Sequence, residues 1–415
     1  MKAITLNRLS RLVALACSLA PAAHGAVFVQ CPGDTNQDAV IDSRDPAHPN
    51  AKCMHLSGGD GFIKMADGYL QYVFGFSDLT GIPPDQAVDA GMLAANFPAP
   101  TIALKQGQEF YLTLTNAGMV NRPDLFDPHT VHFHGFPNAA AVFDGVPEAS
   151  IAINMGASMT YYYRLVEPGT FMYHCHVEAT EHMQMGMLGN LYVDPIQNQT
   201  GIGGTLAAPD VSTRAAKEGG AGPYGYVYND GDGSTAFDVE VAIQLGSFDP
   251  AFHDASMNVQ PLPFAEMKDR YAMMNGRGYP DTVNANPLAP PVNPVTDPDP
   301  GKVSQKVSSL VTAAAGQKVL LRLSNLSVTN FYTVTALGLP MKVVGTGAHI
   351  LRGPGGADLY YDTSSVTLGG GEAVDVIVDT TGVAPGTYFL YTTNLNYLSN
   401  NTEDYGGMMT EIVIN

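Results

Sequence analysis

The sequence is poor in basic residues and contains no tryptophan. It has 20 lysines and arginines against 39 aspartates and glutamates, which gives a formal net charge of −19. A protein that neutralises the phosphates of nucleic acid needs a basic footprint, so this composition argues against a nucleic acid partner. The acidity permits cationic partners, and it is also typical of exported proteins that depend on charge for solubility.

Beyond residue 26 the sequence has no apolar run long enough to span a membrane as a helix. At its start, basic residues precede an apolar run over 12–20 and small residues before Val27, the pattern of a secretory signal. We therefore predict that 1–26 is a signal peptide and that the protein is exported, to the periplasm or the extracellular space. A lipoprotein signal through Cys17 is disfavoured, because Ala14 stands where such signals favour leucine.

Cysteine is scarce, with four residues in the chain. Cys17 leaves with the signal peptide, Cys31 and Cys53 lie close together, and Cys175 stands alone. In an oxidising compartment we expect Cys31 and Cys53 to pair, and in the loop-entropy model such a bridge stabilises by roughly 3 kcal/mol. An unpaired cysteine is unusual in an exported protein, so we expect Cys175 to have a chemical role.

Turn-forming residues divide the rest of the chain into four parts. Clusters of Gly, Pro, Asn and Asp separate short runs rich in β-branched and aromatic residues, which is typical of all-β proteins. We expect β-rich domains over 57–198 and 237–415, a turn-rich segment over 27–56, and a linker over 199–236, with a surface loop at 287–300. Two β-sandwich, Greek-key domains in tandem fit best. The runs expected to form strands are 69–76, 109–114, 159–165 and 188–193, and then 239–244, 319–323, 374–378 and 388–391.

Histidine is concentrated in one region, since six of the eleven histidines lie between 129 and 182. They form the motifs His129-Thr-Val-His132-Phe-His134-Gly and His174-Cys175-His176, followed by His182 and Met187. Alternate side chains of a strand point to opposite faces, so His132 and His134 should share one face, as should His174 and His176. His129 and Cys175 should point the other way. If the two strands are neighbours, the sequence predicts two pockets, one with four imidazoles and one with a His–Cys pair.

The His–Cys pocket gains two more candidate ligands from the segment after Cys175. His182 and Met187 can turn back toward it, which completes a set of two imidazoles, one thiolate and one thioether. This is the ligand set of a trigonal blue-copper site with a weak axial methionine. Zinc is the competing metal, but methionine is a poor ligand for structural zinc. The alternative is that each residue packs or caps locally, which suits a single histidine better than this joint pattern.

The two motifs together resemble the copper-bearing domain of multicopper oxidases, a family that includes laccases and two-domain relatives. The resemblance implies cupredoxin-like domains, with His129, Cys175, His182 and Met187 at a type 1 copper. It implies that His132 binds type 2 copper, and that His134, His174 and His176 bind type 3 copper. Electrons would pass from a small reducing substrate along Cys175 to His174 and His176, where dioxygen is reduced. Segments that extend the resemblance, well over 57–198 and loosely over 237–415, are Phe97–Ile102, Asp144–Pro147, Pro168–Phe171, Met274–Thr282, Leu321–Asn325 and Gly371–Val376.

The chain departs from the family in the loop after Cys175. The interval from Cys175 to His182 is two residues longer than in typical laccases and two shorter than in copper nitrite reductases. Met183 and Met185 are rival axial ligands, but Met187 keeps the family's spacing from His182. The resemblance therefore favours Met187 and leaves the geometry of the loop open.

The second half of the chain lacks the family's other histidine motifs. A trinuclear copper cluster in this family takes eight histidines from two domains, whereas this chain offers four, and the second half has only His253 and His349. We expect His253 to be a hydrogen bonder at a strand end. One hypothesis is an oxidase whose cluster is completed by a partner subunit or a second copy of the chain. The other is an electron carrier or copper-binding module.

Nitrite reduction is disfavoured, because His132 stands where those enzymes place an aspartate and Tyr391–Leu395 stands where they place a catalytic histidine. The electron donor stays open among phenols, Mn(II), Fe(II), Cu(I) and a protein partner.

The segment between Cys31 and Cys53 resembles an EF-hand calcium loop of the dockerin kind, with aspartate in the last position. Ala39 stands where such loops usually have glycine. We expect calcium binding with a structural role, and the alternative is a solvated acidic turn. The expected ligands are Asp34, Asn36, Asp38, the carbonyl of Val40, Asp42 and Asp45.

Overall fold

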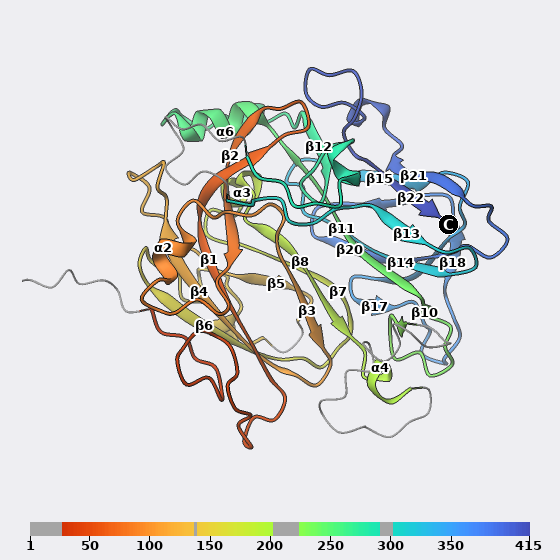
Figure 1. The fold of residues 1–415 in the computed structure, drawn as a ribbon, viewed down its shortest axis with the longest axis horizontal. Coiled ribbons are helices and arrows are strands. Elements are labelled where there is room, and N and C mark those ends of the chain that lie inside the picture. The colour runs from red at the N-terminus through yellow and green to blue at the C-terminus, as the bar shows by residue number, and fades with distance from the viewer. Residues whose placement is uncertain (1–26, 137–138, 202–223, 291–301) are drawn as a thin grey trace, which may run out of the picture.

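The structure is a computed structural model that describes residues 27–136, 139–201, 224–290 and 302–415. The expected signal peptide 1–26 lies outside the described residues, as do most of the expected linker 199–236 and most of the loop 287–300. The described chain forms two β-sandwiches that lie side by side (Figure 1). The first is built by the N-terminal half of the chain and the second by the C-terminal half. The predicted all-β class is confirmed.

The first sandwich consists of two four-stranded sheets, with strand orders β2-β1-β4-β6 and β3-β8-β7-β5. Their facing sides enclose an apolar core that includes Phe74, Phe110, Tyr161 and Leu191. The site described below lies on the second of these sheets. The strands are β1 (Ala51–Lys64), β2 (Leu70–Asp78), β3 (Ala99–Lys105), β4 (Glu109–Gly118), β5 (His132–His134), β6 (Ser158–Arg164), β7 (Gly169–His174) and β8 (Leu188–Asp194).

The second sandwich pairs a large sheet, β12-β11-β14-β20-β16-β17 with β18 against β16, with the five-stranded sheet β13-β22-β21-β15-β19. Every run expected to form a strand overlaps one. The strands are β11 (Val239–Phe248), β12 (Tyr271–Met274), β13 (Val311–Ala313), β14 (Lys318–Asn325), β15 (Tyr332–Ala336), β16 (Met341–Thr346), β17 (His349–Ile350), β18 (Tyr361–Thr363), β19 (Val366–Leu368), β20 (Glu372–Asp379), β21 (Gly386–Thr392) and β22 (Met409–Ile414). A small separate pair is formed by β9 (Gly225–Tyr226) and β10 (Ala236–Phe237).

Helices in the described residues are short. The structure places His182 on helix α3, where the sequence suggested a loop. No helix among the described residues is long and apolar enough to cross a membrane. The helices are α2 (Ala87–Gly91), α3 (Ala179–Met185), α4 (Gln197–Thr200), α6 (Pro250–Met257) and the 3-10 turns η1 (Ala141–Phe143), η2 (Phe264–Glu266), η3 (Asp281–Val283) and η4 (Leu395–Tyr397).

The sheet that carries β5 and β7 packs with its outer face against the large sheet of the second sandwich. Met172 and Leu188 from the first sandwich share an apolar cluster with Phe248 and Ala373 from the second. Apolar surface removed from water in this way stabilises the contact between the two sandwiches. The outer face of β5 and β7 is therefore turned toward the second sandwich rather than toward bulk solvent.

A buried arginine reinforces the same contact. Arg322 on β14 is fully buried and lies 2.6 Å from Glu240 and 3.5 Å from Asp375. Its guanidinium also donates to the Thr170 hydroxyl on β7 at 3.1 Å and lies 3.7 Å from Asp194 on β8. A buried charge must be paired and hydrogen-bonded, so the partners from both sandwiches fix how the two sandwiches dock.

The N-terminal segment packs along the edge of the first sandwich. The disulfide between Cys31 and Cys53 is present, as predicted. The backbone N–H of Phe28 donates to the Ser158 hydroxyl on β6 at 2.8 Å. Strand β1 begins at Ala51 and continues without interruption across the expected boundary between 56 and 57.

Candidate metal centre

Strands β5 and β7 bring the two histidine motifs together. They pair in antiparallel register, with His132 opposite His174 and His134 opposite Met172. Alternation along each strand sends His132, His134 and His174 to the face that looks toward the second sandwich, whereas Cys175 belongs to the core of the first. The structure thus contains the two groups of side chains that the alternation predicted.

The first group, which we call the cysteine group, consists of His129, Cys175, His182 and Met187. The Sγ of Cys175 lies 3.2 Å from Nδ1 of His182 and 4.0 Å from Nδ1 of His129. All four side chains are buried without solvent exposure. The backbone N–H of Thr130 points to the same sulfur at 3.5 Å. Two imidazole nitrogens therefore converge on one thiol in a dry pocket.

The end of helix α3 brings Met187 back to Cys175. Gly186 takes a left-handed conformation, with φ of 117°, and its N–H bonds to the carbonyls of His182 and Met183. After this tight stop, the N–H of Met187 bonds to the His182 carbonyl at 2.8 Å, and the Cys175 N–H bonds to the Met187 carbonyl at 3.0 Å. The helix end therefore fixes the geometry of the loop, which the sequence alone left open.

Gly58 on β1 leaves room for the Met187 and His129 side chains. A Cβ at position 58 would lie 2.8 Å from the His129 ring and 3.3 Å from the Met187 methyl carbon. The rival methionines are placed elsewhere, since Met183 lines the pocket on the other face and Met185 packs in the apolar core. The geometry favours Met187 as the thioether of the cysteine group.

Electrostatics favour a thiolate at this position. Burial opposes ionisation of Cys175, but the neighbouring imidazoles outweigh burial and hold its pKa well below the usual range. Burial likewise opposes the charged form of His182, yet Cys175 and Asp127 raise its pKa to about 10. A thiolate, two imidazoles and a thioether fit a copper ion that changes between its two oxidation states.

Sequence reasoning missed Asp127, which lies beside the cysteine group. Its Oδ2 is 3.7 Å from Nε2 of His182, on the side of the ring that faces away from Cys175. His182 lowers the pKa of the Asp127 carboxyl, which keeps it ionised. At 3.7 Å the carboxylate does not accept a hydrogen bond from the ring, but its negative charge lies beside the edge of His182 that faces away from Cys175. In the sequence, only its position two residues before His129 pointed to a role for Asp127 at this site.

The second group, which we call the histidine cluster, consists of His132, His134, His174 and His176. One ring nitrogen from each of the first three lies within 4.8 Å of the others, and the Nε2 atoms of His134 and His174 are 3.0 Å apart. The His176 ring centroid is 5.0 Å from that of His132. Three imidazoles whose ring nitrogens converge can hold a metal ion. His176 lies beside these three rings.

Backbone carbonyls determine which ring nitrogen of His132 and of His174 is free to bind a metal ion. Nδ1 of His132 bonds to the carbonyl of Asp144 at 2.6 Å, and Nδ1 of His174 bonds to the carbonyl of Cys175 at 2.7 Å. Both bonds require Nδ1–H, so Nε2 is left as the lone-pair donor. Burial, together with the neighbouring imidazoles, lowers the pKa of His174 to about 3 and also lowers that of His134. Neutral rings of this kind are ready to bind metal.

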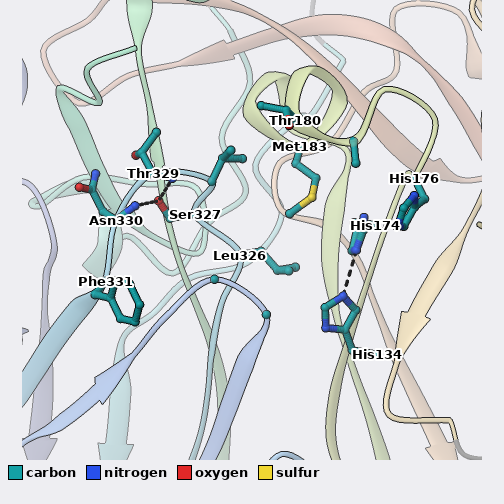
Figure 2. A pocket seen from close by; sticks show the side chains of 14 residues that line it. His134, His174, His176, Thr180, Met183, Leu326, Ser327, Thr329, Asn330 and Phe331 are labelled. Carbon is teal, nitrogen blue, oxygen red and sulfur yellow. Dashed lines mark hydrogen bonds between the residues drawn. The ribbon is translucent and has the colours of Figure 1, made fainter. Parts of the chain in front are cut away.

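Three members of the histidine cluster, His134, His174 and His176, line a pocket of about 470 Å³ between the two sandwiches. Figure 2 shows His134, His174 and His176 on one side and Ser327, Thr329 and Asn330 on the other. Among the described residues, the wall from the second sandwich contributes hydroxyl, amide, apolar and glycine groups but no imidazole. The residues of that wall are Leu326, Ser327, Val328, Thr329, Asn330, Phe331, Gly370 and Gly371.

The second sandwich also touches the histidine cluster directly. Gly371, in the turn between β19 and β20, bonds through its backbone to the His134 ring. A Cβ at position 371 would lie 3.1 Å from Cε1 of His134, and the residue has φ of +89°, which side-chain-bearing residues rarely adopt. The absence of a side chain at Gly371 therefore allows the backbone to hold His134 in place.

Replacing Gly371 with alanine should weaken metal binding at the histidine cluster. The added methyl must displace the His134 ring, and loss of a group that orients a ligand typically reduces metal affinity by about tenfold or more. Copper titration of the histidine cluster measures the effect. Gly356→Ala is the matched control, because it has φ of +83° with no atom near its Cβ position. Equal copper affinities in the two variants would contradict the positioning role of Gly371.

The other candidates from the sequence fall outside both groups. His253 is buried and bonds to the Tyr72 carbonyl at 2.6 Å, a hydrogen-bonding role as predicted, although it lies on helix α6 rather than at a strand end. His349 is exposed and lies 3.4 Å from Glu167. In the N-terminal loop, Asp34 accepts the N–H groups of Gln37 and Ala39, at 2.7 and 2.8 Å.

Two packed β-sandwiches with a buried cysteine and converging imidazoles at the end of one sheet define a cupredoxin-fold protein. The multicopper oxidase family is matched by two sequence profiles, one over residues 81–198 and one over 255–413. These matches together cover more than half of the chain. The chain belongs to the multicopper oxidase family.

Individual relatives are distant. A laccase of Aspergillus fumigatus is 23% identical over 287 residues, which are 65% of this chain and 46% of the relative. L-ascorbate oxidase of Cucurbita pepo is 33% identical over 109 residues, 25% of this chain and 18% of that protein. The chain thus spans less than half the length of these curated relatives.

Solved structures confirm the fold. Blue copper oxidase from Nitrosomonas europaea has a TM-score of 0.60 at 20% identity, covering 88% of this chain and 86% of that one. Copper nitrite reductase from the same organism has a TM-score of 0.54 at 15% identity, covering 88% and 94%. At such low identity the likeness shows the cupredoxin fold and leaves the reaction to be argued from the site.

Proposed function

We propose that this chain is a copper-dependent oxidase that takes electrons from a small reducing substrate at the cysteine group and reduces dioxygen at the histidine cluster. One observation carries the proposal. Cys175 and His174 are adjacent in the chain, yet the sulfur belongs to the first group and the imidazole to the second. A covalent path of one residue therefore joins a site suited to electron transfer to a site suited to a reactive metal.

Copper, when bound, supplies one-electron redox chemistry at the cysteine group and dioxygen reduction at the histidine cluster. The side chains and backbone groups around the two sites hold the ligands in place and set their charge. The N–H of Thr130 stabilises negative charge on Cys175, and the Asp127 carboxylate places a negative charge beside His182. The carbonyls of Asp144 and Cys175 bond to Nδ1 of His132 and His174, which leaves Nε2 of each ring free to bind a metal ion. The pocket of about 470 Å³ is large enough to admit dioxygen.

Dioxygen uptake by copper-loaded protein tests this function. We expect uptake with at least one donor from a panel of phenols, Fe(II), Mn(II) and Cu(I). The family membership and the relatives named laccase and ascorbate oxidase support this choice of acceptor. The disulfide between Cys31 and Cys53 supports export to the periplasm or the cell exterior, since such bonds persist in oxidising compartments.

The second candidate function is an electron carrier or copper-binding protein without oxidase activity. The wall of the pocket from the second sandwich favours it, because the described residues there add no imidazole to the four of the histidine cluster. Such a protein would exchange electrons through the cysteine group and consume no dioxygen with any donor. The same uptake assay separates the two functions.

An oxidase needs more ligands than this chain offers at the histidine cluster. We propose that a partner subunit, or a second copy of the chain, contributes histidines to the pocket and completes the copper cluster. The support is the count of four imidazoles and the location of the pocket at the junction of the two sandwiches. A protein with a completed cluster should be an assembly rather than a monomer when its mass is measured.

A calcium ion is our proposal for the N-terminal loop, with ligands from Asp34, Asn36, Asp38, Val40, Asp42 and Asp45. Ala39 has φ of 67°, the left-handed conformation that the glycine of an EF-hand loop supplies. Its N–H bonds to Asp34, the first ligand position. These two features support the turn that such a loop requires.

Calcium chelation should lower the melting temperature without bleaching the visible absorption of copper-loaded protein. Ligand at a hundredfold excess over its dissociation constant stabilises by about 3 kcal/mol, which corresponds to a shift of about 5 °C or more. The loop lies apart from the cysteine group, so the colour should persist. Scanning calorimetry and absorbance before and after a calcium-selective chelator measure both effects. A melting temperature that does not respond to calcium would leave the loop as a solvated acidic turn.

A further inference from the structure

We propose that the thioether of Met183 is a ligand of the copper ion at the histidine cluster and makes that site selective for Cu(I). This inference rests on the proposed function, in which the histidine cluster holds copper, and it names a ligand other than histidine. It follows from the place of Met183 in the pocket and from the kind of donor that the rest of the pocket lacks.

Met183 enters the same pocket as three of the four imidazoles. Its side chain lines the cavity of about 470 Å³ together with those of His134, His174 and His176. Figure 2 shows Met183 pointing from helix α3 into the pocket, beside His174. The Nε2 atoms of His134 and His174 are 3.0 Å apart. A thioether at this position can reach an ion that these two imidazoles bind.

Helix α3 supplies the two copper sites with consecutive residues. A helix has about 3.6 residues per turn, so neighbouring side chains point about 100° apart. His182 reaches the Sγ of Cys175 at 3.2 Å, whereas Met183 faces the pocket between the sandwiches. Met185 packs in the core of the first sandwich, and Met187 follows the helix end into the cysteine group. The same short helix thus presents one methionine to the histidine cluster.

Packing holds the Met183 side chain on this side of the helix. Met183 is partly buried against an apolar cluster that includes Met172, Leu188 and Leu326. Leu326 comes from the second sandwich and lines the same pocket. A side chain that packing already restrains loses less rotamer freedom on binding an ion than a free surface methionine does. The contact between the sandwiches therefore prepares Met183 for binding.

The chemistry of the pocket favours Cu(I) once Met183 takes part. The facing wall offers the oxygen and nitrogen groups of Ser327, Thr329 and Asn330, and among the described residues that line the pocket Met183 alone carries sulfur. Thioether and imidazole groups suit Cu(I), whereas neutral oxygen groups suit harder ions. Imidazoles joined by one thioether therefore form a ligand set for Cu(I).

A ligand that stabilises Cu(I) also favours one direction of electron transfer. Met183 would promote the transfer of one electron from Cu(I) of the cysteine group, which becomes Cu(II), to Cu(II) of the histidine cluster, which becomes Cu(I). No bond to a substrate forms or breaks in this step, and no proton or further reactant enters the balance. Met183 thereby supports the direction of electron flow that the oxidase needs.

Met172 is the rival thioether near the same imidazoles. It lies opposite His134 in the register of β5 and β7, and both residues line a separate pocket of about 230 Å³. His174 and His176 do not line that pocket. Met172 is also 1% exposed and packs in the apolar cluster between the sandwiches. It is therefore a matched control for Met183 rather than an equal candidate.

The first test compares Cu(I) with Zn(II), which binds imidazole but takes thioether poorly. Full-length protein without dioxygen, with its cysteine group filled by one equivalent of Cu(I) and its N-terminal loop by excess calcium, is titrated with Cu(I) against the chelator bicinchoninate. A parallel sample is titrated with Zn(II). We expect Met183→Leu to lower the Cu(I) affinity of the histidine cluster about tenfold or more, since groups that merely orient a ligand contribute that much. Its Zn(II) affinity should be unchanged, and Met172→Leu should match the wild type for both ions.

This comparison separates a ligand from a structural residue. If Met183 only shaped the pocket, its loss would disturb the imidazoles and lower both affinities together.

Magnetic resonance of the methionine methyl groups provides a readout that does not depend on affinity. Protein labelled with carbon-13 at these methyl groups is titrated with Cu(I), and the Met183 signal is identified by its absence in Met183→Leu. We expect Met187 to shift with the first equivalent and Met183 with the second. In His174→Ala the Met183 signal should stay in place, because the ion has lost an imidazole ligand.

The outcomes separate this inference from the proposed function. A Met183 signal that does not move while the histidine cluster takes up Cu(I) would overturn the inference, as would a shift of Met172 in its place or an unchanged Cu(I) affinity in Met183→Leu. If dioxygen uptake persists in any of these cases, the oxidase stands and the thioether ligand is wrong. If Met183 binds Cu(I) but no donor supports dioxygen uptake, the ligand stands and the oxidase function fails.

Discussion

Replacing Cys175 with serine should abolish the visible colour of copper-loaded protein and reduce dioxygen uptake to the rate of the uncatalysed reaction. An intense charge-transfer absorption requires a thiolate bonded to copper(II), and a serine hydroxyl does not supply one. The buried imidazoles of His129 and His182 remain, so the pocket can still take up an ion. Absorption spectra and metal analysis of the same samples measure the loss of colour separately from the loss of copper.

A control for this prediction is the double variant Cys31→Ser with Cys53→Ser. It removes two sulfur atoms and the disulfide but leaves the cysteine group untouched. We expect it to be less stable than the wild type and to keep its colour. A colourless wild type that nevertheless contains copper would refute the assignment of Cys175, since the pKa of its thiol is already held well below the usual range by His182 and His129.

The sequence was sufficient to predict the fold and the two groups of side chains, because both depend on local rules. Alternation along a strand separates His132 and His134 from His129, and β-branched and aromatic runs mark the strands. The pairing of His132 with His174 needed one further assumption, that the two strands are neighbours, and the register confirms it. These features need no knowledge of how the two sandwiches pack.

What the sequence did not predict comes from contacts between distant parts of the chain. Helix α3 was expected as a loop, because its seven residues are too few for a clear helical period. Gly371 lies more than two hundred residues from His134, and no pattern in the sequence relates the two. Asp127 was overlooked for another reason: a single aspartate before a histidine motif is common, and only the direction of the His182 ring gives it a role.

Replacing His132 with alanine should remove the copper of the histidine cluster and stop dioxygen uptake, while the visible colour persists. His132 is one of the three imidazoles that converge, and its Nδ1 bond to the Asp144 carbonyl leaves Nε2 free to bind a metal ion. It lies on the opposite face of the sheet from the cysteine group. Reduction of the colour by a donor without dioxygen should therefore proceed as in the wild type. His349→Ala, which removes an exposed imidazole from the second sandwich, should change none of these properties.

Metal analysis combined with mass-resolved chromatography tests whether the copper cluster is completed only in an assembly of more than one chain. Four imidazoles are too few for the three ions of a trinuclear cluster, so an isolated monomer should hold the copper of the cysteine group and at most one or two weakly bound ions. Turnover should then appear only in fractions whose mass exceeds that of the chain, where another histidine-bearing surface reaches the pocket. A monomer that carries four tightly bound copper ions and consumes dioxygen would refute the incomplete cluster. In that case, ligands other than histidine must complete it, and Ser327, Thr329 and Asn330 on the facing wall are the first to replace.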